Sequence, residues 1–142
     1  MRVSAKAEYA CIAMLELAAN RGTQPVRVKA IADAHNIPSS FLVQILLQLK
    51  GAGLVESTRG AAGGYLLAKP SDTISLGDVV AAIDGAVNSR PPADGLEPSP
   101  VVAAVRSVWQ ELQAAEQRRL SELTLADLVR RTYPSSAPSY QI

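Results

Sequence analysis

Reactive and metal-binding side chains are scarce in this sequence, which holds one cysteine and one histidine in 142 residues. The single cysteine, Cys11, cannot form a disulfide within the chain, which agrees with a reducing compartment. It shares an apolar stretch with Met14, so we expect it to be a buried packing residue. His35 ends a predicted helix, where we expect a phosphate contact or solvent exposure. One cysteine and one histidine provide neither a nucleophile–base pair nor a metal-ligand set, so we expect no enzyme activity.

Long apolar runs are also absent. Glu8, Glu16, Gln44 and Gln48 interrupt the longest ones, and none approaches the roughly 18 apolar residues of a membrane span. The amino-terminal stretch carries acids inside its apolar part and lacks a small-residue cleavage site, which argues against a secretory signal. We therefore expect a cytoplasmic protein with no membrane partner.

Charge of one sign does not dominate the whole chain, whose formal net charge is +1. The two halves of the chain, however, differ in the sign of their net charge. Residues 1–70 carry eight basic and four acidic residues, a net charge of +4, whereas residues 71–142 carry six and nine, a net charge of −3. This asymmetry is typical of a module that binds a polyanion, joined to a neutral or acidic assembly module. Scattered surface lysines can give the same bias.

The first 36 residues predict two helices. Ser4 is suited to cap a helix from about residue 5 to residue 20, whose apolar face would be formed by Ala7, Cys11, Met14, Leu15 and Ala18. A shorter helix is expected over residues 28–35 with Ile31 facing inward. Asn36 follows at a position where a left-handed residue can end it.

A third helix begins at Pro38 and Ser39 and ends at Gly51 and Gly53, with five residues predicted for the core: Phe41, Leu42, Ile45, Leu46 and Leu49. The second and third helices together have the pattern of a helix-turn-helix. In that motif, outward residues at the start of the second helix meet base edges in the major groove, here Ser39, Ser40, Val43 and Gln44. The alternative for each of them is a solvated surface residue.

These side chains suit different parts of DNA. Gln44 can bond adenine through two hydrogen bonds, and Val43 can touch a thymine methyl group. The serines can donate to phosphates or bases. Four basic residues are better suited to phosphates, which position a protein without reading sequence: Arg2, Lys6, Lys29 and Lys50.

Residues 51–70, GAGLVESTRGAAGGYLLAKP, predict a β-hairpin from residues 54–58 and 65–68. Gly60, Gly63 and Gly64 permit the positive φ angles that a tight reversal needs. Arg59 lies at the root of a tip without bulky side chains, which can enter a minor groove about 6 Å wide. An ordinary solvent-exposed hairpin is the alternative, but its place behind a helix-turn-helix favours a winged helix.

The last third of the chain predicts a dimerisation helix. Ser99 and Pro100 can start a helix that reaches about residue 121. Its apolar residues follow spacings of four and three, as in a coiled-coil seam, with Trp109 beside them: Val101, Val105, Val108, Leu112 and Ala115. A second copy of the chain would cover this stripe, unless the stripe packs on its own winged helix. Thr124 and Asp127 resemble the capping box of a final short helix over residues 124–131.

Three segments resemble the Rrf2 family of bacterial winged-helix regulators: MRVSAKAEYA, IPSSFLVQILLQLKGAGLVESTRGAAGGYLLAKP and ISLGDVVAAIDG. The resemblance implies a homodimeric transcription factor that binds imperfect palindromes in double-stranded DNA. By position it implies a major-groove set of Ser40, Phe41 and Gln44, and a minor-groove pair of Arg59 and Gly60. Many members hold an iron–sulfur cluster through three cysteines after the third segment. Here that stretch reads AVNSRPPADGLEPSPVV, so we expect no cluster, metal or other cofactor.

Together these features predict a mainly α fold with a small β-hairpin. We expect a winged helix-turn-helix over residues 1–85, a flexible Pro-rich loop over 86–99, the dimerisation helix and a short final helix over 100–132, and a disordered tail over 133–142. The predicted function is that of a cluster-free homodimeric repressor acting on a palindromic operator. The alternative is a winged-helix interaction module that regulates a metabolic enzyme. The effector, a small molecule or a protein, stays open.

Overall fold

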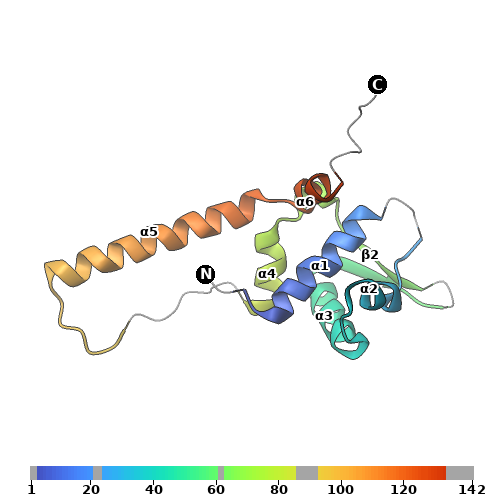
Figure 1. The fold of residues 1–142 in the computed structure, drawn as a ribbon, viewed down its shortest axis with the longest axis horizontal. Helices are drawn as coiled ribbons and strands as arrows, with labels where there is room; N and C mark the ends of the chain where they lie inside the picture. The colour runs from blue at the N-terminus through green and yellow to red at the C-terminus, as the bar shows by residue number, and fades with distance from the viewer. Residues whose placement is uncertain (1–2, 21–23, 61–62, 86–92, 134–142) are drawn as a thin grey trace, which may run out of the picture.

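The computed structural model describes residues 3–20, 24–60, 63–85 and 93–133. Arg2, the first part of the Pro-rich loop (86–92) and the tail from residue 134 therefore lie outside the described residues. The fold is mainly helical with one small hairpin, as predicted (Figure 1). Its elements are α1 (Ala5–Ala19), α2 (Val28–His35), α3 (Ser39–Gly51), β1 (Val55–Thr58), β2 (Gly64–Leu67), a 3-10 turn (Ser71–Thr73), α4 (Leu76–Asp84), α5 (Pro100–Glu122) and α6 (Leu125–Thr132).

The helix ends follow the signals in the sequence. The hydroxyl of Ser4 accepts a hydrogen bond from the Ala7 amide and caps α1. Asn36 ends α2 in the left-handed conformation, with φ 57° and ψ 42°. Gly51 is the last residue of α3, and Gly53, at φ +79°, supplies the turn into β1. The predicted boundaries of these three helices are confirmed to within a residue or two.

The buried face of α1 differs from the prediction. Ala7 and Met14 are buried, but Cys11, Leu15 and Ala18 are only half-buried, and the rest of the buried face comes from Ala10, Ala13 and Leu17. The reason is that α1 is packed on several sides, by α3, α4, α6 and β2. An alanine-rich helix with neighbours on several sides has no single apolar face for its spacing to reveal.

The hairpin pairs β1 and β2 antiparallel, with Val55 opposite Leu67 and Thr58 opposite Gly64. Of Gly60, Gly63 and Gly64, each of which permits a positive φ, only Gly60 adopts one, +102°. The other two positions need glycine for room. A Cβ atom on Gly63 would lie 2.4 Å from the Thr58 carbonyl oxygen, and one on Gly64 would lie 2.4 Å from that of Val26.

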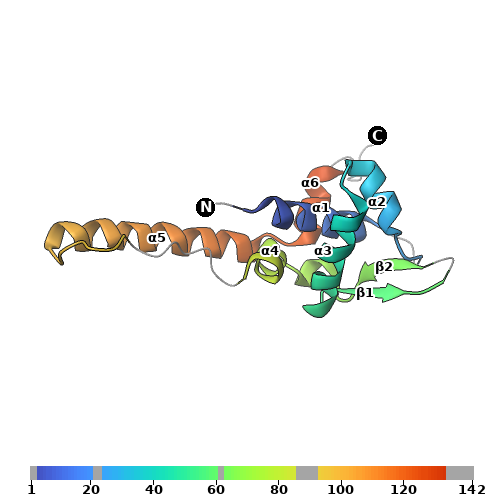
Figure 2. The same cartoon turned by 90° about the horizontal axis from the view of Figure 1, so that it is seen from below.

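The close approach at Gly64 lets the chain before α2 join the hairpin. The amide of Val26 donates to the Tyr65 carbonyl at 2.9 Å, and the amide of Tyr65 donates back at 2.8 Å. The hairpin is thus hydrogen-bonded on its inner edge to the segment that begins the helix-turn-helix. Figure 2 shows the hairpin extending to one side of α3 and α5 extending to the opposite side.

Two capped helix starts meet where α5 returns to the winged helix. Ser75 and Thr124 each form a full capping box, with Asp78 and Asp127 respectively, and the two cap residues face each other in an antiparallel bridge. Backbone hydrogen bonds from Leu76 to Leu123 (2.8 Å) and from Leu125 to Ile74 (2.9 Å) complete it. The Thr124 backbone amide is the main cause that lowers the pKa of Asp127. The predicted capping box at Thr124 is confirmed.

Candidate nucleic-acid interface

One face of α3 forms the core and the other lies open to solvent. Leu42, Ile45, Leu46 and Leu49 are buried, as predicted. The residues predicted to meet base edges are exposed on the opposite face: Ser39, Ser40, Val43 and Gln44. This arrangement leaves one face of α3 open to solvent, as a helix that enters a major groove requires.

The exposed face of α3 includes a residue that our sequence reasoning missed. Leu47 is 54% exposed, more than Val43 at 39%. It follows Val43 by four positions and Gln44 by three, so it lies on the same face of the helix. Its spacing could have indicated this, but an apolar residue in a leucine-rich helix is ordinarily assigned to the core. Leu47 adds exposed apolar surface of the kind that can touch thymine methyl groups.

Phe41, predicted both for the core and for the major groove, is half-buried. Its ring contacts Tyr9 of α1 in an edge-to-face arrangement, with ring centroids 5.6 Å apart and ring planes at 87°. This contact fixes the start of α3 against α1. Phe41 is therefore better placed to position the helix than to read bases with its ring.

The end of β1 carries the predicted minor-groove pair. Arg59 is exposed, and within the described part of the chain it makes no hydrogen bond or ion pair. Gly60 follows it with its positive φ. The hairpin is tied to α3, because Lys50 Nζ donates to Ser57 Oγ of β1 at 2.8 Å. The guanidinium of Arg59 can thus extend from a hairpin that is held to α3 two residues before it.

The residues predicted for phosphates differ in their surroundings. Lys29 is 82% exposed and forms a pair with Asp33 at 3.1 Å, one turn further on α2. Such exposed pairs contribute little and open readily to a competing anion. Lys6 is half-buried on α1. Lys50 is exposed and holds Ser57, so a phosphate would have to share its ammonium group.

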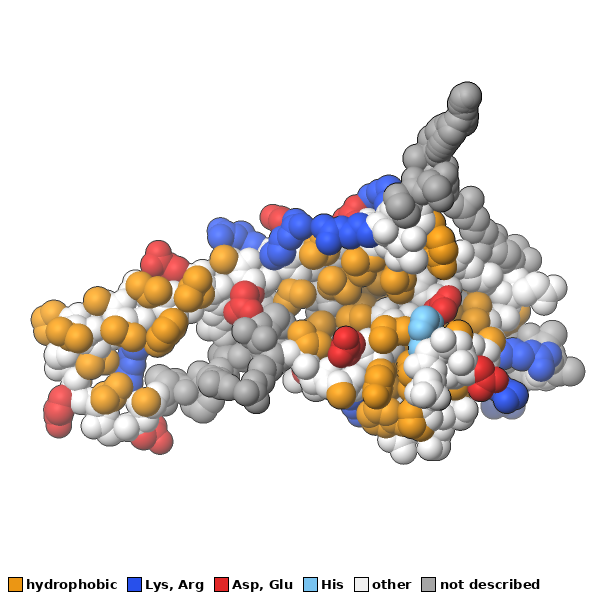
Figure 3. Space-filling model, viewed as in Figure 1, with side chains coloured by type: hydrophobic (Ala, Val, Ile, Leu, Met, Phe, Trp, Pro, Cys, Tyr) orange, Lys and Arg blue, Asp and Glu red, His pale blue; other side chains and the backbone are white. Residues whose placement is uncertain are grey.

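The apolar stripe of α5 is not packed on the winged helix, so that alternative is wrong for the described chain. Exposure is 73% for Val101, 46% for Val105, 48% for Val108, 61% for Trp109 and 53% for Leu112. Ala115 is exposed as well. Figure 3 shows hydrophobic side chains gathered along α5, which projects from the rest of the molecule. A helix with this much apolar surface in water is typical of one half of an interface.

The two reactive side chains are engaged within the fold. Cys11 is half-buried, and burial, followed by the carboxylates of Glu8 and Asp84, raises the pKa of its thiol to about 11. His35 is exposed, as one of its two expected roles requires, and its Nε2 also donates to Glu16 Oε2 at 2.5 Å. No sequence pattern relates these two residues, which lie 19 positions apart on two different helices.

The whole described chain has close relatives among known proteins. A family model for Rrf2, described as an iron-dependent transcriptional regulator, matches residues 3–131. A Mycobacterium tuberculosis protein named as an HTH-type transcriptional regulator is 43% identical over 136 residues, covering 94% of this chain and 84% of its own. CymR of B. subtilis, described as its global cysteine regulator, superimposes with a TM-score of 0.82 at 34% identity, over 92% of this chain and 98% of its own. IscR of T. potens superimposes with a TM-score of 0.78 at 32% identity, over 100% of this chain and 94% of its own.

Proposed function

Since the chain belongs to the Rrf2 family of helix-turn-helix transcriptional regulators, we propose that it is a homodimeric repressor that binds a palindromic operator. The observation that carries the proposal is the exposed pair of readers, Gln44 on α3 and Arg59 on the hairpin. They extend from two elements that Lys50 and Ser57 join. In this proposal Gln44 reads a base edge in the major groove and Arg59 enters the adjacent minor groove. Such a regulator acts in the cytoplasm, where bacterial DNA lies.

The exposed stripe of α5 supports the homodimer. Val105, Val108 and Leu112 follow one another at spacings of three and four, the spacing of a coiled-coil seam. A second α5 packed along it would remove this apolar surface from water. The resulting two-fold symmetry would present two copies of α3 to two half-sites, which is why we propose a palindromic operator.

The residues of this chain do not fit an iron–sulfur cluster, although the matching family model is described as iron-dependent. Such clusters are held by several thiolates with occasional imidazole. The sequence holds one cysteine, whose raised pKa disfavours the thiolate, and one histidine, which is bound to Glu16. In the part of the chain that the structure describes, no three metal-ligating side chains cluster. We therefore propose regulation without a cluster.

No described helix is both long and apolar enough to cross a membrane.

The proposal is tested with DNA from upstream of the chain's own gene. The protein should bind this fragment, and selection among randomised half-sites should reveal a preferred base at the position that Gln44 reads. Gln44→Ala should weaken the free energy of binding to this DNA by about 1–3 kcal/mol and relax that base preference. Gln48→Ala, one turn later on α3, should keep the preference. If Gln44→Ala leaves the selected sequence unchanged, Gln44 does not read a base and the proposed reading mode is wrong.

A further inference from the structure

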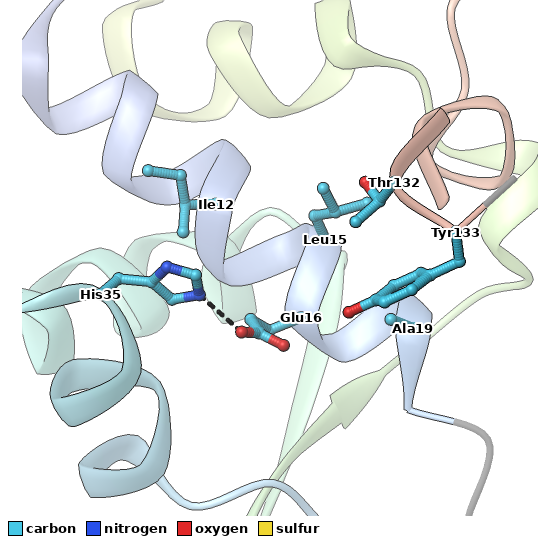
Figure 4. Close-up of a pocket in the computed structure, with 7 residues that line it drawn as sticks. All are labelled: Ile12, Leu15, Glu16, Ala19, His35, Thr132 and Tyr133. Atoms are coloured by element: carbon cyan, nitrogen blue, oxygen red, sulfur yellow. Dashed lines mark hydrogen bonds and ion pairs between the residues drawn. The ribbon is translucent and has the colours of Figure 1, made fainter. Parts of the chain in front are cut away.

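A pocket of about 160 Å³ lies away from the α3 face and the hairpin tip, between α1, α2 and α6. Figure 4 shows the seven residues that line it. Four come from one face of α1, since they follow one another at helical spacing; the others come from the last residue of α2 and the end of α6. They are Ile12, Leu15, Glu16, Ala19, His35, Thr132 and Tyr133.

Most of the pocket wall is apolar, and its polar groups gather at one place. Ile12, Leu15 and Ala19 provide aliphatic surface, and the ring of Tyr133 faces them with its hydroxyl directed toward Glu16 (Figure 4). The Glu16 carboxylate accepts the hydrogen bond from His35, and the two side chains are 33% and 36% exposed. The pocket thus combines an apolar wall with an accessible carboxylate.

The volume and the carboxylate together define the class of ligand. A cavity of about 150 Å³ is known to hold a benzene ring, so this pocket fits a molecule of about six to eight heavy atoms. An ionised carboxylate accepts hydrogen bonds and does not donate them. A complementary head group therefore donates hydrogen bonds and carries positive charge. An anion of the same size would be repelled.

We propose that this pocket binds a small apolar primary amine, whose ammonium group replaces His35 as the partner of the Glu16 carboxylate. The ammonium group offers three donors and a full charge, whereas the imidazole gives one hydrogen bond. The apolar part of the ligand lies against Ile12, Leu15 and Ala19. Nothing in this binding step depends on DNA.

The exchange has a consequence for the helix-turn-helix, and this consequence rests on the proposed function. His35 is the last residue of α2, and Asn36 turns the chain into α3. The bond between His35 and Glu16 is a side-chain link from α1 to this turn. When an amine takes Glu16, the link is lost, and the turn before the reading helix loses a restraint. The pocket is then the effector site of the regulator.

Binding is tested by NMR on the full ¹⁵N-labelled chain with three probes that share one ring: benzylamine, benzyl alcohol and benzoate. His35 is the sole histidine, so its ring nitrogen signals are assigned without ambiguity. Benzylamine should shift Nε2 of His35 and the amides of Glu16 and Ala19. Benzyl alcohol should bind about tenfold more weakly, because it lacks the charge, and benzoate should not bind. Equal binding of the three probes, or shifts centred elsewhere, would overturn the proposal.

Two variants separate charge from shape. Glu16→Gln keeps the shape of the pocket and should lower the affinity for benzylamine to that for benzyl alcohol. Ala19→Leu fills the apolar end and should weaken both probes. Glu8→Gln, which removes the same charge from an exposed position on α1 outside the pocket, should leave benzylamine binding unchanged. A Glu16→Gln variant that still prefers the amine would contradict the role of the carboxylate.

The regulatory step has its own readout. Benzylamine at saturation should weaken binding to the upstream DNA by about fivefold or more in the unchanged protein. Glu16→Gln at the same benzylamine concentration controls for ionic strength and should show no such loss. Unchanged DNA binding at saturation would overturn the effector role. If the chain binds no DNA but still binds benzylamine at Glu16, the proposed function fails and the pocket assignment stands.

Discussion

Tyr9 on α1 and Phe41 on α3 meet edge to face, with their ring centroids 5.6 Å apart. This contact joins the first helix of the fold to the start of the helix proposed to read DNA. It assigns Phe41, the sole phenylalanine of the chain, to positioning α3. Edge-to-face aromatic pairs contribute about 0.5–1.5 kcal/mol beyond the burial of their surface.

The first prediction measures this contact by a double-mutant cycle. Tyr9→Leu and Phe41→Leu should each lower the free energy of unfolding, and the double variant should lose less than the sum, by about 0.5–1.5 kcal/mol. Urea denaturation of the four proteins provides the values. Additive losses would mean that the two rings do not stabilise each other.

The second prediction concerns the room that the hairpin needs. Gly64→Ala places a Cβ atom 2.4 Å from the Val26 carbonyl oxygen. The two backbone hydrogen bonds between Val26 and Tyr65 must therefore open, and the protein must become less stable to unfolding. Gly51→Ala is the matched control, since a Cβ atom there has nothing within 4 Å and alanine favours a helix. Thermal unfolding should show a lower midpoint for Gly64→Ala and an equal or higher one for Gly51→Ala. Equal midpoints for the two variants would be inconsistent with the close approach.

The third prediction concerns the reactivity of Cys11. Because burial and two neighbouring carboxylates raise its pKa from 9.0 to about 11, the thiolate fraction at pH 8 is about 100-fold below that of an ordinary thiol. The sign follows from the charge, since these surroundings disfavour the anion. Alkylation by iodoacetamide should be slow at pH 8 and should accelerate up to about pH 11. Rapid labelling at pH 7 in the folded protein would contradict this and would make a thiol sensor plausible.

The fourth prediction tests the α5 stripe. Val108→Glu places a charge in the proposed seam and should convert the proposed dimer to a monomer of 15.0 kDa. Gln110→Glu adds the same charge on the other side of α5 and should leave the dimer intact. Light scattering gives the mass, and the fluorescence of Trp109, the sole tryptophan, should move to the red when the seam opens. A Val108→Glu protein that stays dimeric would exclude this stripe as the interface.

The sequence predicts those parts of the fold that local chemistry controls. The side chains of Ser4 and Thr124 cap the starts of α1 and α6, and the left-handed backbone of Asn36 ends α2. The neighbouring residues are enough to predict each of these three helix ends. The site residues of α3 could be named because the core face of that helix defines its opposite face. The family resemblance added roles for Arg59 and Gly60, which local chemistry alone leaves ambiguous.

The features that could not be predicted depend on distant segments. Gly64 has no room for a Cβ atom because of the Val26 carbonyl group, and Glu16 of α1 is bound to His35 of α2. The pocket joins residues 12–19 to residues 132 and 133, which periodicity cannot relate. The buried face of α1 was misassigned for the same reason, since α4 and α6 pack on sides of the helix that its spacing does not distinguish.

The salt dependence of DNA binding is the most direct test of the proposed function. With about six phosphates contacted per dimer, the slope of log K against log salt should be near −5. Arg59→Ala should weaken binding and make that slope shallower by about two, one for each subunit. Arg131→Ala removes the same charge from α6, away from the hairpin in both views, and should leave the slope unchanged (Figures 1 and 2). No binding at low salt, or an Arg59→Ala protein with unchanged affinity and slope, would contradict the account.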